Sequence, residues 1–197
     1  MPILAPGMRI GLLGGSFNPP HAAHRAVSLL ALKRLRLDRI WWLVSPGNPL
    51  KDNKQLPRLD DRLERACAVA ADPRIDVTAI EAAFSTVFSH DTVAKLRARY
   101  PNVRFVFLMG ADNLAGFHRW KRWRALACMV PIAVMDRAGL SLTALASPAA
   151  LALARWRLGE PNARALARTK PPAWVFLHGM KSPLSSTAIR AKTKRKG

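Results

Sequence analysis

Apolar residues in this chain of 197 residues form short strand-like runs that alternate with segments of helical spacing. Compact apolar runs are typical of buried strands, whereas apolar residues three or four positions apart are typical of helices. We predict strands at residues 10–13, 40–44, 75–80, 103–109, 129–135 and 174–178. We predict a first helix that ends near residue 35, and further helices at 60–71, 89–100 and 149–158. The order of strand, turn and helix at the start of the chain is typical of α/β folds.

The turn between the first strand and the first helix carries the most chemistry. Residues 14–24 read GGSFNPPHAAH. Gly14 and Gly15 let backbone N–H groups approach a ligand, and the start of the following helix adds a partial positive charge. His21 and His24 lie three residues apart in the expected first helical turn, so both can face one anion. Because histidine donates hydrogen bonds and can be charged near neutral pH, this stretch predicts a phosphate site.

A pair of histidines is also compatible with metal binding. However, no glutamate follows His21 as in H-E-x-x-H, and no third ligand lies nearby in the sequence. We therefore assign the pair to phosphate and predict no metal-ligating side chains.

Composition points to one folded domain. Half of the residues are apolar, and 197 residues are enough for a well-buried core. Cys67 and Cys128 lie far apart in apolar segments, so we expect two buried, reduced thiols in a cytoplasmic protein. There is no signal-peptide pattern and no apolar run of about 18 residues, so we expect no membrane partner.

The chain is strongly basic, with 32 Lys and Arg against 12 Asp and Glu and a formal charge of +20. Such a surface attracts polyanions without sequence preference, and residues 117–123 (FHRWKRW) could stack bases. A basic nucleic-acid-binding protein is therefore an alternative function. The chain has no RNP motif, zinc-finger spacing or helix-turn-helix signal, so we predict no specific nucleic acid as partner.

The stretch at 14–24 resembles the G-x-F-x-P-x-H-x-G-H signature of the nucleotidyltransferase superfamily, which has a Rossmann-like fold. Ala23 departs from the family glycine, and its methyl group is small enough for a first helical turn. The resemblance implies ATP binding by residues 14–17 (Gly14, Gly15, Ser16 and Phe17) and catalytic roles for His21 and His24.

Two further stretches are similar to motifs of the same superfamily. Residues 182–190 (SPLSSTAIR) place hydroxyls at a helix start with an arginine one turn later, a set of donors suited to a triphosphate. They resemble the family's I-S-x-T-x-I-R, which implies ATP binding by Ser185 and Thr187 and a catalytic role for Arg190. Gly110 and Asp112 match the family's G-x-D and imply contacts to ATP.

Weaker similarities point to the bacterial nicotinate mononucleotide adenylyltransferases. The stretch at 45–51 (SPGNPLK) is similar to one after the second strand of that family and implies a catalytic Lys51, which would otherwise be a solvated lysine. Ser89 stands where the family has a threonine near the nicotinate carboxylate, although a plain helix cap explains it equally well. Trp120 matches a tryptophan that stacks on the pyridine ring, and Arg137 matches an arginine common after that strand.

The resemblance covers nearly the whole chain. It implies a single Rossmann-like α/β domain over residues 1–197, with a parallel sheet, helices on both faces and a basic tail at 191–197. The implied reaction joins ATP and nicotinate mononucleotide to give deamido-NAD and pyrophosphate, with Mg²⁺ entering with ATP. Nicotinamide mononucleotide and phosphopantetheine remain alternative acceptors, and the sequence does not determine the oligomeric state.

Overall fold

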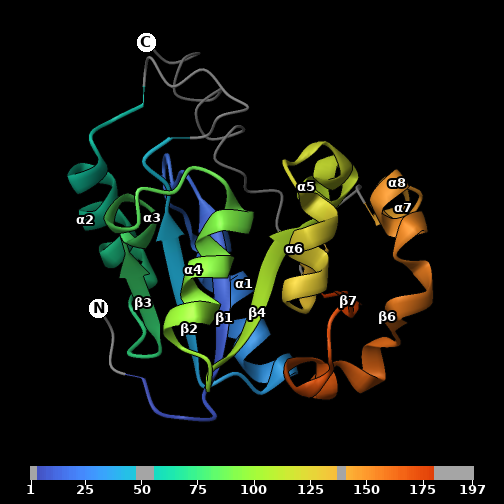
Figure 1. The fold of residues 1–197 in the computed structure, drawn as a ribbon. Coiled ribbons are helices and arrows are strands. Elements are labelled where there is room, and N and C mark those ends of the chain that lie inside the picture. Colours follow the sequence, from blue (N-terminus) through green and yellow to red (C-terminus); the bar gives the residue numbers. More distant parts are fainter. Residues whose placement is uncertain (1–3, 48–55, 137–140, 180–197) are drawn as a thin grey trace.

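A parallel sheet of seven strands forms the centre of the computed structural model, which describes residues 4–47, 56–136 and 141–179. The strand order is β3-β2-β1-β4-β5-β7-β6, and all six pairings are parallel (Figure 1). The strands are β1 (Arg9–Gly15), β2 (Arg39–Val44), β3 (Ile75–Thr78), β4 (Arg104–Gly110), β5 (Ile132–Met135), β6 (Arg157–Leu158) and β7 (Trp174–Leu177). This sheet confirms the predicted Rossmann-like fold class.

The order of the strands reverses next to β1. The chain builds outward from β1 through β2 to β3 and then returns to place β4 on the other side of β1. In open α/β sheets, ligands bind at such a point, outside the carboxyl ends of the strands. The glycine turn that follows β1 lies at this point.

Helices cover both faces of the sheet, as predicted (Figure 1). One face packs against α1 (Ala22–Leu35), α2 (Leu59–Ala70) and the 3₁₀ helix η3 (Glu160–Arg168). The other face packs against α4 (Ser89–Arg99), α5 (Ala111–Gly116), α6 (Trp123–Met129), α7 (Ser141–Leu145) and α8 (Pro148–Ala152). Three shorter elements are α3 (Ile80–Ala83) and the 3₁₀ turns η1 (Phe117–Arg119) and η2 (Ala154–Trp156).

Two neighbouring tryptophans in β2 show how alternation fills both faces. Trp41 joins the core under α4, and Trp42 joins the core under α1; neither is exposed. The indole Nε1–H of Trp42 donates to the Ser28 hydroxyl at 2.8 Å, and that hydroxyl donates to the backbone oxygen of His24 at 2.9 Å. The first turns of α1 are therefore tied to the middle of the sheet by a buried hydrogen-bond chain.

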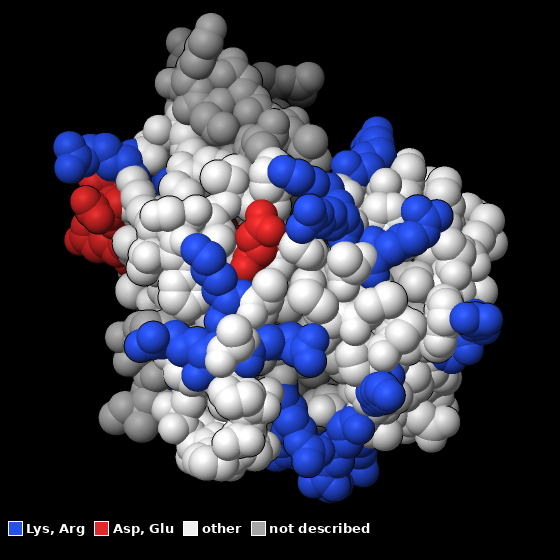
Figure 2. Space-filling model, in the orientation of Figure 1, with Lys and Arg blue, Asp and Glu red and all other residues white. Residues whose placement is uncertain are grey.

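Acidic side chains near the amino ends of the strands are held by arginines. Asp38 accepts two side-chain hydrogen bonds from Arg9, and Asp76 accepts two from Arg39. Figure 2 shows many Lys and Arg side chains spread over the face of the molecule that is in view, with few Asp and Glu between them. On this face the basic side chains are therefore dispersed rather than gathered at one site.

Most predicted elements differ from the observed ones by one or two residues, and three of the differences have a clear structural reason. The strand predicted at 75–80 ends at Thr78, because Ile80 begins α3. The strand predicted at 129–135 begins only at Ile132, because the preceding residues complete α6. The helix predicted at 149–158 ends at Ala152 and is followed by η2 and the edge strand β6. There, the indole of Trp174 donates to the backbone oxygen of Leu153 at 2.8 Å. In a longer helix, that oxygen would accept a hydrogen bond from a later backbone N–H.

The prediction of buried cysteines is wrong. Cys67 and Cys128 are both unpaired and exposed. In α2, Ala66 and Ala70 face the sheet, so Cys67, about 100° around the helix from Ala66, faces solvent.

The substitution Ser28→Ala tests the buried chain between Trp42 and α1. We expect it to lower the free energy of unfolding by about 1–3 kcal/mol, because the Trp42 N–H loses its acceptor in a dry environment. Urea denaturation measures this change. The matched control Thr169→Ala removes an exposed hydroxyl that donates to the Ala165 backbone oxygen, and should change stability by less than about 0.5 kcal/mol. Equal effects of the two substitutions would contradict the assignment.

Candidate active site

The turn between β1 and α1 leaves space beside its backbone. Gly14 is exposed, and Gly15 and Ser16 are half-buried. A Cβ atom built on Gly14 would meet no described protein atom within 4 Å. Because neither glycine has a positive φ, the protein's own conformation does not require glycine here. Open space beside the backbone is what the close approach of a phosphate needs.

The side chain of Phe17 anchors this turn to the sheet. Its φ is +46°, an uncommon value for a residue with a side chain, and it is 1% exposed. The ring stacks on Trp42 with centroids 4.9 Å apart and contacts the His24 ring at 4.7 Å. The side chain of Phe17 therefore belongs to the core, and it fixes the ring of His24 against the sheet.

The two histidines lie together at the start of α1, as the spacing predicted. Their ring centroids are 3.9 Å apart. The backbone N–H of His21 donates to Nδ1 of His24 at 3.2 Å, and the backbone N–H of His24 donates to the oxygen of His21 at 2.9 Å. Because Nδ1 of His24 accepts a hydrogen bond, the proton of the neutral ring is on Nε2. This tautomer presents an N–H donor suited to a phosphate oxygen.

The carboxyl end of β4 lies beside that of β1. The two strands pair in register up to Leu13 and Leu108, so the residues that follow them reach the same edge of the sheet. Gly110 is the N-cap of α5, and Asp112 is exposed in the first turn of that helix. The structure thus brings together two of the predicted ATP-binding stretches at the point where the strand order reverses.

Trp120 and Trp123 have different surroundings. Trp123 is 8% exposed and packs in the core. Trp120 is half-buried, with its ring edge-on to Phe107 at 6.2 Å and Phe117 at 5.4 Å. These contacts hold the indole while part of it stays accessible.

The sequence position of Ser89 suggested a helix cap, but Ser89 is not the N-cap of α4. The helix begins at Ser89, and the cap is Phe88, with φ −110° and ψ 136°. The Phe88 oxygen accepts from the backbone N–H groups of Asp91 and Thr92 at 2.9 and 3.2 Å. Ser89 is therefore the first helical residue, and it remains half-buried at the helix start.

Five predicted site residues lie outside the described ranges: Lys51, Arg137, Ser185, Thr187 and Arg190. Their assignments remain predictions from the sequence.

A buried carboxyl that the sequence did not reveal lies beneath the start of α4. Glu81 is 6% exposed, and Thr92 Oγ1 donates to Glu81 Oε1 at a long 3.5 Å. The Thr86 and Thr92 hydroxyls are 2.8 Å apart. Burial raises the pKa of Glu81 to about 7, and the Thr92 hydrogen bond opposes this shift. Sequence alone held no clear signal, because a glutamate is normally exposed.

Arg62 was also missed. This α2 residue is 1% exposed, and its guanidinium donates to the backbone oxygens of Ser16, Ser45, Pro46 and Pro57. Burial lowers the pKa of Arg62. An arginine in an amphipathic helix with two acids in its first turn gives no hint of burial, because arginines there are usually solvated.

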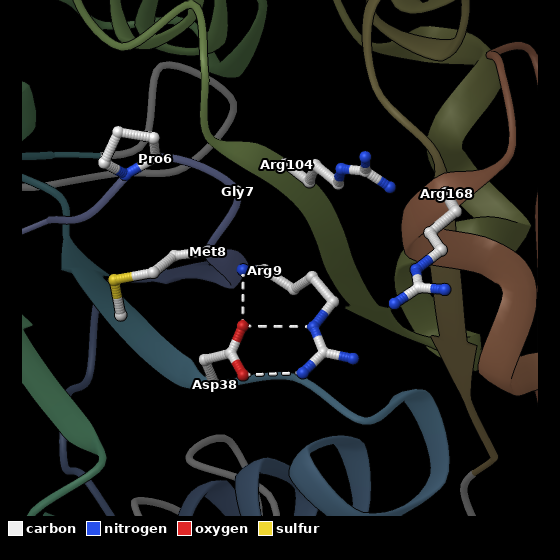
Figure 3. Close-up of a pocket in the computed structure, with 7 residues that line it drawn as sticks. All are labelled: Pro6, Gly7, Met8, Arg9, Asp38, Arg104 and Arg168. Carbon is white, nitrogen blue, oxygen red and sulfur yellow. Dashed lines mark hydrogen bonds and ion pairs between the residues drawn. The ribbon is translucent and has the colours of Figure 1, made fainter.

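A pocket of about 500 Å³ lies at the opposite edge of the sheet (Figure 3). It is lined by Pro6, Gly7, Met8, Arg9, Asp38, Arg104 and Arg168, at the amino ends of β1 and β4. The helices of a parallel α/β fold end at this edge, where their partial negative charge attracts cations. Its arginines therefore have a structural explanation, and we assign the pocket no catalytic role.

Within the described ranges, no three His, Cys, Asp or Glu side chains form a group that could hold a metal ion. In the same ranges, no helix is long and apolar enough to span a membrane.

A family model described as cytidylyltransferase-like matches residues 12–192. The chain therefore belongs to this family of nucleotidyltransferases, which the fold and the turn with His21 and His24 already indicated.

Curated relatives narrow the assignment. A probable nicotinate-nucleotide adenylyltransferase of Bradyrhizobium sp. (strain ORS 278) is 59% identical over 93% of this chain and 95% of its own. A probable nicotinate-nucleotide adenylyltransferase of Brucella suis is 54% identical over 93% of this chain and 94% of its own. Within the family, the chain is thus a member of the nicotinate-nucleotide adenylyltransferases, and the predicted resemblance is confirmed.

Solved structures agree on the fold. A Plasmodium falciparum nicotinic acid mononucleotide adenylyltransferase complexed with NaAD has a TM-score of 0.68 at 17% identity, covering 93% of this chain and 83% of that one. The same enzyme complexed with APC has a TM-score of 0.67.

Glu81→Gln should make stability less dependent on pH. The carboxyl titrates near its ordinary pKa of 4.5 when unfolded and near 7 when folded, so the folded state binds more protons between these values. Wild-type stability therefore loses a contribution as pH rises from 4.5 to 7, and that loss is complete above 7. Relative to wild type, the variant should gain up to about 3 kcal/mol between pH 4 and pH 8.

Urea denaturation at pH 4, 6 and 8 measures this gain, with exposed Glu64→Gln as the matched control. A stability difference between wild type and Glu81→Gln that is the same at all three pH values would refute the prediction.

Proposed function

We propose that this chain transfers the adenylyl group of ATP to nicotinate mononucleotide, giving nicotinate adenine dinucleotide and pyrophosphate, in NAD biosynthesis. The observation that carries the proposal is the His21–His24 pair on the open glycine turn at the strand reversal. The relatives named above, at 54–59% identity over nearly their whole length, support the choice of reaction.

The chemistry needs no protein nucleophile. A phosphate oxygen of the mononucleotide attacks the α-phosphorus of ATP, and the bond from that phosphorus to the oxygen bridging the β-phosphate breaks. Pyrophosphate leaves with the negative charge. The protein's contribution is therefore to align the two phosphates and to stabilise the charge that develops.

In this proposal, the histidines act on the phosphates. His24 donates from Nε2, and His21 lies next to it at the helix start, where the partial positive charge favours an anion. Lys51 and Arg190 neutralise the leaving pyrophosphate. The nucleotide is held by Gly14, Gly15, Ser16, Gly110, Asp112, Ser185 and Thr187, and by the backbone of Phe17, whose side chain is buried.

The pyridine end of the acceptor is assigned to Ser89, Trp120 and Arg137. The accessible part of the Trp120 indole offers a face for the ring. The hydroxyl and the backbone N–H groups at the start of α4 suit a carboxylate better than an amide, because they are donors near a helix N-terminus. This favours nicotinate over nicotinamide mononucleotide and over phosphopantetheine, which lacks a pyridine ring.

Magnesium fits this site as an ion delivered with ATP. A hard cation prefers oxygen ligands, and Asp112 places an exposed carboxylate just after β4, whereas no three His, Cys, Asp or Glu side chains of the described ranges form a group that could hold the ion alone. When bound, the ion neutralises phosphate charge. The phosphates and water supply most of its ligands.

We assign the protein to the cytoplasm as a single domain over residues 1–197 with a basic tail at 191–197. Its two unpaired, exposed cysteines fit a reducing compartment. The basic face in Figure 2 favours phosphate-bearing substrates and attracts other polyanions without specificity.

The proposal is tested by pyrophosphate release from Mg²⁺-ATP with each of three acceptors: nicotinate mononucleotide, nicotinamide mononucleotide and phosphopantetheine. We expect the highest kcat/KM with nicotinate mononucleotide, with the dinucleotide identified by mass spectrometry. A higher kcat/KM with either other acceptor would overturn the substrate assignment. Release with none of them, together with sequence-selective, salt-resistant binding of RNA or DNA, would favour the nucleic-acid alternative.

His24→Ala should lower kcat by about 10²–10³-fold, the usual effect of removing one donor to a developing charge. The melting temperature should change little by comparison, because the ring is half-buried. The control Lys33→Ala removes an exposed cation from the last turn of the same helix and should leave kcat unchanged. A His24→Ala enzyme with near wild-type kcat would make the residue a helix-start residue only.

A further inference from the structure

Arg62 is a buried cation whose described partners are all backbone oxygens. Its Nη1 donates to Ser16 at 2.8 Å and to Ser45 at 2.7 Å, its Nε donates to Pro57 at 3.0 Å, and its Nη2 reaches Pro46 at 3.4 Å. Among the described residues it makes no ion pair with a carboxylate. Arginines are almost never fully buried unless they are paired, so this arrangement requires an explanation.

The four carbonyls come from three separate segments. Ser16 belongs to the turn after β1, Ser45 and Pro46 follow β2, and Pro57 precedes α2. Because one nitrogen binds both Ser16 and Ser45, it fixes the distance between the turn that joins β1 to α1 and the loop that follows β2. The backbone N–H of Ser45 also donates to Gly15 at 3.0 Å, so the two segments are held at adjacent positions.

The contact at Ser16 leads directly to the histidines. The Ser16 carbonyl is part of the peptide bond that precedes Phe17, the residue with φ +46°. The ring of Phe17 in turn packs on His24, which contacts His21. Holding the Ser16 carbonyl therefore fixes the peptide that orients Phe17, and through it the ring that faces the ligand.

We propose that Arg62 is a positioning residue for the phosphate-binding turn: it holds the turn in its ligand-binding conformation before the nucleotide arrives. The inference rests on the proposed function, because it assigns the turn to phosphate. A preformed turn avoids the cost of ordering the site at each binding event. The buried positive charge also lies directly behind the turn, where a bound polyphosphate supplies the negative charge that the described surroundings lack.

The test compares Arg62→Lys and Arg62→Gln with Arg65→Gln, which removes an exposed arginine one turn along α2. Lysine keeps the charge but cannot reach all of the carbonyls. We expect Arg62→Lys to stay folded, with kcat lowered about tenfold and KM for ATP raised. Arg62→Gln should lose about 10²-fold in kcat, the scale expected from misplacement of about 1 Å.

The division of effects between the two substrates separates positioning from general damage. KM for the mononucleotide should change less than KM for ATP, because Ser89 and Trp120 lie on other elements. The inference is overturned if Arg62→Lys has wild-type kcat and KM for ATP, or if both KM values rise equally while the melting temperature falls.

The wild-type protein tests the inference without any variant. We expect crystal structures determined with and without a non-hydrolysable ATP analogue to show the same backbone conformation at residues 14–18 and the same Arg62 hydrogen bonds to Ser16 and Ser45. A turn that takes this conformation only with the analogue would show that the nucleotide, not Arg62, orders it. An inactive wild type with an ordered turn would instead refute the proposed function and leave the preformed turn standing.

Discussion

The reversal of strand order between β1 and β4 is the constraint on which the site depends. With β1 at the centre of a parallel sheet, the carboxyl ends of its two neighbours meet at one edge. The turn after β1, which carries the histidines, and the Gly110–Asp112 segment after β4 both lie at that edge, although nearly a hundred residues separate them in the chain. No side chain creates this proximity; it follows from the order in which the strands are laid down.

The side chains then determine how rigid the edge is. A layer of aromatic rings, Phe17 on Trp42 and His24 on Phe17, connects the catalytic turn to the sheet. Ser28 joins the same layer by hydrogen bonds to Trp42 and to the His24 backbone. Packed rings have few alternative positions, so the histidines are oriented by the core rather than by solvent. The histidines of the site therefore pack directly on the hydrophobic core.

The sequence was most informative where a local pattern determines the structure. Apolar periodicity predicted the long strands, and the spacing of His21 and His24 predicted their contact at the helix start. It failed at the end of α8, where the distant Trp174 indole donates to the Leu153 carbonyl, and at the start of α4, where the helix begins one residue earlier than the Ser89 cap predicts. Arg62 was missed because its burial depends on segments far away in the chain, those of Ser16 and Ser45. Glu81 was missed because charged residues are normally exposed. The cysteines were misjudged because an apolar segment does not reveal which face of its helix turns outward.

The exposure of Cys67 and Cys128 has a consequence for how the size of this protein is measured. The two thiols lie on helices that cover opposite faces of the sheet, too far apart for the approach of about 4.4–6.8 Å between Cα atoms that a disulfide needs. Air oxidation therefore cannot close a bond within one molecule, but it can join neighbouring molecules at either face. A chain with two such thiols can link into dimers and longer covalent strings. Molecular masses determined without a reductant would then report this chemistry and not the native assembly.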